Sequence, residues 1–168
     1  MDARILLILP CNGGVRFGDY GLGSNWRIVY SWLSDYIGSG LVELAAVDSC
    51  KPGLVYRGEE YKYRGCDTIP YWDRLYSKDP HRFHMLVEGL RRDIAEAALK
   101  YRAIVSYVNV KAYRLALEEA SKLAGVPLVN AGPSLLSPLS FRSKSSLRKL
   151  RQVVEGLSRQ ATRSSVFH

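Results

Sequence analysis

The sequence predicts an α/β fold, a three-layer sandwich on a mostly parallel, Rossmann-like sheet of four or five strands. Three observations lead to this prediction. Short runs rich in Ile, Leu and Val alternate four times with stretches of helical periodicity. The first of these runs, residues 4–10, is almost entirely apolar, as is typical of a strand buried on both faces. The 168 residues are 47% hydrophobic, enough for one domain whose core needs no disulfide or metal.

The first part of the chain contains two predicted strands joined by a helix. Arg4–Pro10 is the first strand, and a polar loop with five glycines follows it over residues 11–23. Ser24 can cap the next helix. The apolar face of this helix consists of Ile28, Val29, Trp32, Leu33 and Tyr36. Glycines at the end of the helix lead into the second strand, Leu41–Val47.

A long connection, residues 48–80, separates the second strand from the next helix. Loops of this length are uncommon in a compact domain and are often functional. We expect at most a short strand within it, near Lys62–Arg64 or Asp67–Pro70. Asp79 then caps a helix that has proline at its first position, and the helical period continues to about Tyr101.

The remaining strands continue the alternation. Ala103–Tyr107 is the third strand, and Lys111–Ala124 is the helix after it, closed by Gly125 and Pro127. Pro127–Asn130 is the fourth strand. This order implies right-handed crossovers and helices on both faces of the sheet. Ligands of such sheets bind outside the carboxyl ends of the strands. The segments expected there are Cys11–Tyr20, Asp48–Arg57, Asn109–Arg114 and Asn130–Ser134.

The net charge of +8 is concentrated near the C-terminus, because residues 134–168 hold seven basic residues and one acidic residue. We divide the chain into an α/β domain, 1–133, and a basic Ser/Pro-rich linker with an amphipathic helix, 134–168. Leu147–Leu157 is the predicted helix, and Ser158–His168 is expected to fray. The helix can present its cations to RNA phosphates, or the segment is only a solvated tail. The candidate nucleic-acid contacts are Arg142, Lys144, Arg148, Lys149 and Arg151.

The glycine-rich loop after the first strand is a candidate ligand site, with an ordinary turn as the alternative. Its glycines allow close backbone approach, although the spacing is neither that of a P-loop nor GxGxxG. Two residues are candidates for catalysis. Cys11 is a nucleophile that needs a base, or a cysteine without a catalytic role. Asp48 is a general base or a turn cap. The candidate ligand-binding residues are Asn12, Gly13, Gly14, Arg16, Ser49, Arg57, Asp67, Trp72 and Asp73.

Several classes of protein are excluded by composition and spacing. No apolar run approaches the roughly 18 residues of a membrane span, and we expect no membrane partner, although the net charge of +8 would also suit an anionic membrane surface. The three cysteines are widely spaced and form no CxxC pair, which indicates a cytoplasmic protein without a zinc site or disulfide framework. His81 and His84 are expected to be solvated in the first turn of their helix. We expect no metal and no cofactor.

Several segments resemble the α/β domain of archaeal archaeosine synthase, a paralogue of tRNA-guanine transglycosylase. They are Leu6–Cys11, Val42–Ser49 with Pro52–Glu59, and Cys66–Asp73. The resemblance covers roughly residues 4–130, although Val15-Arg16-Phe17 stands where the synthase has Lys-Pro-Tyr. The matched positions are Pro10, Cys11, Asp48, Ser49, Gly53, Leu54, Arg57, Glu59, Asp67, Pro70, Trp72 and Asp73.

This resemblance implies a protein of tRNA modification, of the archaeosine (deazaguanine) type, that binds RNA or a deazapurine. Its implied partners are tRNA or another RNA and a protein of the transglycosylase type. Whether the chain is an enzyme stays open. The alternatives are a non-catalytic module that binds RNA or protein, and a small enzyme that acts on a nucleotide or nucleobase.

Overall fold

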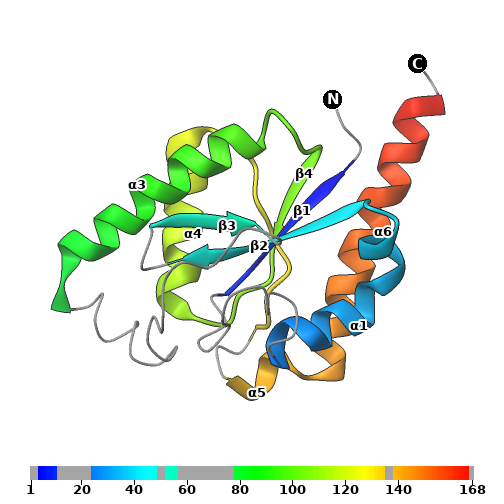
Figure 1. The fold of residues 1–168 in the computed structure, drawn as a ribbon, viewed down its shortest axis with the longest axis horizontal. Coiled ribbons are helices and arrows are strands. Elements are labelled where there is room, and N and C mark those ends of the chain that lie inside the picture. The colour runs from blue at the N-terminus through cyan, green and yellow to red at the C-terminus, as the bar shows by residue number, and fades with distance from the viewer. Residues whose placement is uncertain (1–3, 11–23, 49–51, 57–77, 135–137, 167–168) are drawn as a thin grey trace.

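The computed structural model is an α/β fold built on a five-stranded mixed sheet (Figure 1). It describes residues 4–10, 24–48, 52–56, 78–134 and 138–166. The strands are β1 (Ile5–Leu9), β2 (Val42–Asp48), β3 (Gly53–Tyr56), β4 (Ala103–Ser106) and β5 (Val129–Asn130). Their order in the sheet is β3-β2-β1-β4-β5. β1 pairs in parallel with β2 and β4, β4 pairs in parallel with β5, and β3 runs antiparallel to β2.

The α/β class and the alternation of strands and helices are confirmed, but the sheet is mixed. β3 lies in the segment that we expected to be a loop, because the chain turns back after Asp48 and pairs Gly53 with it in a hairpin. Gly53 has a φ of 144°, which other residues rarely adopt. The two places where we expected a short strand, Lys62–Arg64 and Asp67–Pro70, lie outside the described residues.

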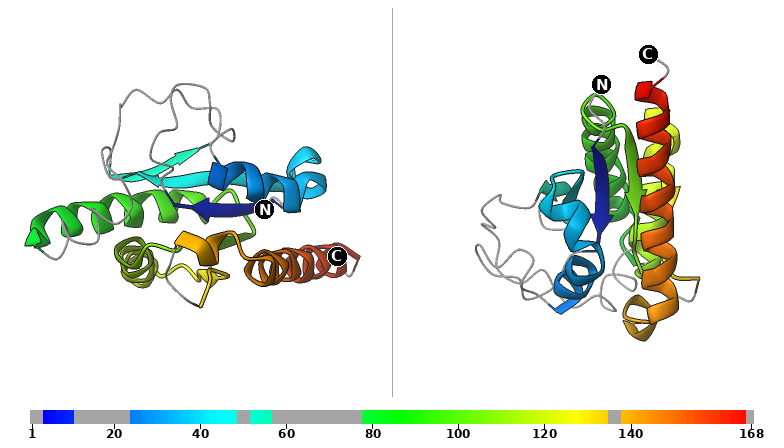
Figure 2. Two further views of the ribbon diagram at one scale, coloured as in Figure 1. Left: turned by 90° about the horizontal axis from the view of Figure 1, so that it is seen from below. Right: turned by 90° about the vertical axis from the view of Figure 1, so that its right-hand side faces the viewer.

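Helices lie on both faces of the sheet. They are α1 (Ser24–Gly38), α3 (Pro80–Ala97), α4 (Lys111–Ala124), α5 (Pro138–Phe141) and α6 (Lys144–Val166). α3 and α4 lie side by side on one face, and α1 and α6 lie together on the other (Figures 1 and 2). The strand order explains why α1 and α4 lie on opposite faces, since the right-handed crossovers from β1 to β2 and from β4 to β5 run in opposite directions along the sheet.

The helix ends agree closely with the capping signals in the sequence. Asp79 caps α3 as predicted, because its Oδ1 accepts a hydrogen bond from the Arg82 N–H at 3.3 Å. Gly125 ends α4 with a φ of 67°, also as predicted. α3 is shorter than expected and ends at Ala97 rather than near Tyr101.

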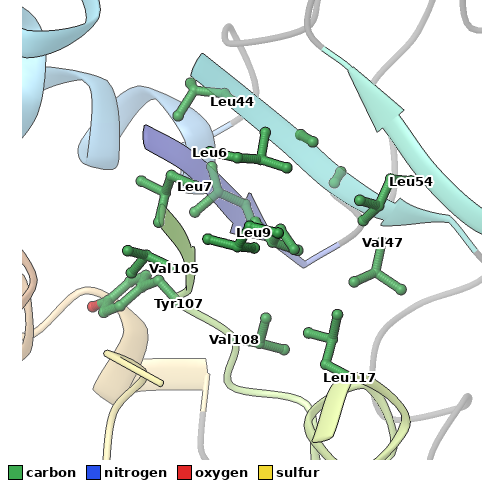
Figure 3. Close-up of a cluster of buried hydrophobic side chains, with 14 of the residues drawn as sticks. Leu6, Leu7, Leu9, Leu44, Val47, Leu54, Val105, Tyr107, Val108 and Leu117 are labelled. Atoms are coloured by element: carbon green, nitrogen blue, oxygen red, sulfur yellow. The ribbon is translucent and has the colours of Figure 1, made fainter. Parts of the chain in front are cut away.

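The hydrophobic core lies between the sheet and both helical layers. All five residues of β1 are buried, and Figure 3 shows Leu6, Leu7 and Leu9 of this strand among side chains of β2, β4 and α4. The same core continues into α6 through Leu147, Leu150 and Val154. The parts that we separated as 1–133 and 134–168 therefore share one hydrophobic core.

The C-terminal helix is longer than the sequence indicated. We expected a helix over Leu147–Leu157 and a frayed end, whereas α6 extends from Lys144 to Val166. Ser143 caps it, since its Oγ accepts a hydrogen bond from the Ser146 N–H at 3.2 Å. Within the described ranges, no helix is both long and apolar enough to cross a lipid bilayer.

Candidate functional site

The carboxyl edge of the sheet contains a topological switch point between β1 and β4. These strands are neighbours, and the chain leaves them in opposite directions, toward β2 from one and toward β5 from the other. In open α/β sheets, crevices for ligands form at such points. Asp48 ends β2 at this edge, and Asn109 follows β4. Both polar side chains are buried, with exposed fractions of 1% for Asp48 and 6% for Asn109.

Most of the predicted pocket lies outside the described residues. This applies to the candidate nucleophile Cys11 and to all nine candidate ligand-binding residues, namely Asn12, Gly13, Gly14, Arg16, Ser49, Arg57, Asp67, Trp72 and Asp73. Of the two candidate catalytic residues, the structure places only Asp48, in a buried position suited to hydrogen bonding. The role of Asp48 as a general base stays a prediction.

Arg114 joins two of the segments that we expected at this edge. Its Nη2 donates hydrogen bonds to the carbonyl oxygens of Val108, at 2.6 Å, and Pro133, at 2.8 Å. It therefore ties the loop after β4 to the loop after β5, and its burial lowers the pKa of the guanidinium. A Cβ at Gly132 would lie 2.4 Å from the same Nη2 and 2.9 Å from the Val108 carbonyl oxygen, so a larger residue would disturb this contact. The sequence gives one indication of this contact: Arg114 lies in the first turn of a helix that follows a strand.

The β2–β3 hairpin is fixed to α3 by two close approaches. The Leu54 N–H donates a hydrogen bond to Asp93 Oδ2 at 2.8 Å. A Cβ at Gly89 would lie 2.0 Å from the Pro52 carbonyl oxygen, so a larger residue would push the hairpin away from α3. These contacts hold Pro52 and the start of β3 against α3. The sequence did not predict these contacts. The hydrogen bond joins residues 39 positions apart, and both contacts depend on β3, which was not expected.

A groove lies between Pro52 and the outer face of α3. It is lined by Pro52, His84, Met85, Glu88, Gly89, Arg91, Arg92, Ala95 and Glu96. Glu88 and Arg91 form an ion pair of 2.8 Å within it. His81 and His84 are exposed at the start of α3, as predicted. Nowhere in the described segments do three or more His, Cys, Asp or Glu side chains form a group able to hold a metal ion.

The outward face of α6 is strongly basic. We call Lys144, Arg148, Lys149 and Arg159 the cationic face; all four side chains are exposed, as is Arg142 just before the helix. Lys144, Arg148 and Lys149 form no ion pair with any other described residue. Arg159 lies 3.6 Å from Glu155 and keeps 74% of its side chain exposed. The first turn of α6 contains no acidic residue.

Arg151, the fifth predicted contact, is directed at α1 and keeps 31% of its side chain exposed. Its guanidinium donates two hydrogen bonds to the Asp35 carboxylate, at 2.8 and 3.0 Å, and one to the Trp32 carbonyl oxygen at 2.8 Å. It also lies 5.1 Å from the ring centre of Tyr36. We therefore leave Arg151 out of the cationic face.

Comparison with known proteins adds support for the fold. No protein-family model matches the chain, and no curated protein matches it significantly. Among solved structures, the chain is similar to the crystal structure of AF0587, a protein of unknown function, with a TM-score of 0.57 and 18% identity. The match covers 90% of this chain and 44% of that one, so the chain spans less than half of its neighbour's length. At this level of identity, the similarity shows that the two proteins share the α/β fold.

Proposed function

We propose that this protein binds RNA through the cationic face of α6 and acts in tRNA modification of the deazaguanine type. The observation that carries the proposal is an exposed row of Lys and Arg on a helix whose apolar side is already buried. Such side chains bind phosphates and give affinity that depends on salt. The first turn of α6 supports the proposal, because cations at a helix N-terminus oppose the macrodipole unless an anion lies nearby.

An anionic membrane surface is a poorer partner for the same helix. Amphipathic helices bind membranes by inserting their apolar side chains among the lipids. In α6 those side chains are already packed in the core, since Leu147, Leu150 and Val154 are each at most 1% exposed. Membrane binding would have to extract them, whereas binding to nucleic acid leaves them in place.

The proposed ligand site is the carboxyl edge of the sheet, which is where ligands bind if the fold is Rossmann-like. Under the resemblance to archaeosine synthase, this edge holds a deazapurine, with Asp48 hydrogen bonded to the ring edge. The position of Asp48 at the end of β2, next to the switch point, supports this role. A protein of the transglycosylase type is the proposed protein partner.

A salt titration of tRNA binding tests the RNA part of the proposal. We expect filter binding to show affinity at low salt that falls linearly on a logarithmic scale as salt rises. The variant Arg148→Glu/Lys149→Glu is expected to weaken binding and to reduce the magnitude of the salt slope by about 2. The control Lys100→Glu/Lys122→Glu makes the same change in net charge at exposed sites outside α6. No binding at low salt, or equal losses in both variants, contradicts the proposal.

Nucleoside analysis tests the modification part. We expect mass spectrometry of tRNA from cells that lack the gene to show a changed level of a deazaguanine nucleoside. Restoring the gene with Asp48→Asn is expected not to correct the change, whereas the wild-type gene corrects it. Unchanged nucleosides contradict a role in modification, and full correction by Asp48→Asn removes Asp48 from the mechanism.

A further inference from the structure

We propose that the RNA bound at the cationic face is a base-paired stem and that α6 lies across its minor groove. This inference rests on the proposed function, since it names the kind of RNA that the same face recognises. Three features of α6 support it: the absence of stacking side chains, the arrangement of the cations, and an exposed glycine at the centre of the face.

The first feature is the absence of a stacking platform. Proteins that bind single-stranded nucleic acid combine cations with aromatic side chains on which unpaired bases stack. The sequence of α6 contains no Phe, Tyr or Trp. On the neighbouring helix α1, the ring of Tyr36 is faced by the guanidinium of Arg151 at 5.1 Å. The cationic face therefore offers contacts for phosphates and ribose, but it contains no aromatic ring on which an unpaired base could stack.

The second feature is the arrangement of cations around the helix. At about 100° per residue, Arg148 and Arg159 lie on one side of the exposed face and Lys149 lies on the other. The exposed residues Gln152 and Gly156 lie between them. Base-paired RNA has a wide, shallow minor groove that displays ribose 2′-hydroxyls between two rows of phosphates. The cations match the phosphates on the two rims, and the Gln152 amide can hydrogen bond with the hydroxyls between them.

The third feature is Gly156. It is exposed in the interior of α6, and a Cβ built there would have nothing within 4 Å. Glycine is among the least favourable residues in a helix interior, and neither a close contact nor a positive φ requires it at this position. A partner that approaches the helix backbone gives a reason for the missing side chain. On this view, Gly156 is the point at which the groove surface comes nearest to α6.

Binding of three fluorescent probes tests the inference on the full chain. They are an RNA hairpin with a stem longer than one helical turn, an unpaired oligouridine with the same number of phosphates, and a DNA duplex of the stem sequence. At one salt concentration, we expect the hairpin to bind about tenfold tighter than oligouridine. It should also bind several-fold tighter than DNA, which lacks the 2′-hydroxyl. Equal or tighter binding of either competitor overturns the inference, while absence of all RNA binding overturns the proposed function instead.

A matched pair of glycine variants tests the close approach. Gly156→Ala and Gly38→Ala each add one methyl group to an exposed helical position with open space around it, on α6 and α1 respectively. Both are expected to fold with an unchanged or higher Tm, because alanine favours the helix. We expect Gly156→Ala alone to weaken binding of the hairpin, by roughly 3- to 10-fold. Unchanged binding by Gly156→Ala, or equal weakening by Gly38→Ala, contradicts the close approach.

Discussion

Arg151 explains an irregularity in α1. The helix is kinked at Leu33, which has a φ of −126° and a ψ of 21°. A side chain that inserts into the hydrogen-bond ladder is one of the recognised causes of such kinks. The Trp32 carbonyl oxygen, immediately before the kink, accepts its hydrogen bond from Arg151. The arginine of α6 therefore fits a bend in α1 and fixes how the two helices meet.

The ion pair between Arg151 and Asp35 should make stability depend on pH. The hydrogen bonds from Arg151 are the main reason that the pKa of Asp35 is lowered from 3.8 to about 2. A carboxyl group with a depressed pKa stabilises the fold above its unfolded pKa, and this contribution is lost as pH falls through the folded pKa. We expect the wild-type protein to exceed Asp35→Asn in Tm above about pH 4 and to lose this advantage by about pH 2. Thermal melts between pH 2 and pH 6 check this, and a difference independent of pH contradicts it.

Gly89 gives a prediction opposite to its helix propensity. Alanine normally stabilises a helix interior relative to glycine. At position 89, however, its Cβ would meet the Pro52 carbonyl oxygen at 2.0 Å. We expect Gly89→Ala to lower the free energy of unfolding by about 1–3 kcal/mol. Urea denaturation measures the change, with Gly38→Ala as the control that should not destabilise; a stabilised Gly89→Ala protein would refute the packing of the hairpin on α3.

At the scale of elements, the sequence predicted the strands and helices that carry strong local signals. The apolar run of β1, the cap at Asp79 and the terminal glycine at Gly125 all correspond to observed features. β3 was missed because it has only four residues, in a segment marked by glycine and proline. The last turns of α6 were missed because Ser158, Arg159 and Gln160 do not continue the apolar stripe. The helix extends through these residues because they have adequate helical propensity and continue directly from turns of α6 that are packed in the core.

The docking of α6 is itself testable. Leu150 is fully buried in the core that α6 shares with the sheet, whereas Leu123 on α4 is 58% exposed. We expect Leu150→Ala to lower the free energy of unfolding by about 2–5 kcal/mol. Leu123→Ala is expected to change it by no more than about 0.5 kcal/mol. Equal small effects in denaturant titrations would show that α6 is not part of the folded body.

At the scale of the whole molecule, one helix has two roles: α6 carries the row of exposed cations, and its apolar side is part of the hydrophobic core. The candidate site could be predicted only in part from the sequence. The strand order placed Asp48 at the carboxyl edge, and the charge count identified α6. The sequence could not show that Arg151 packs against α1, because its partner Asp35 lies 116 positions away and the geometry depends on a kink. Charge reversal on the surface is therefore a better test than truncation, since removal of α6 would open the core.

Lysine footprinting on the full chain tests the central claim, that RNA binds at the cationic face, most directly. Lys144 and Lys149 lie on that face, and Lys100, Lys111 and Lys122 are exposed elsewhere. Mass spectrometry can measure how fast each lysine is acetylated with and without saturating tRNA, and requires no variant. We predict that tRNA slows acetylation of Lys144 and Lys149 and leaves the other three unchanged. Equal protection of all five lysines, or none at the first two while tRNA is bound, contradicts the claim.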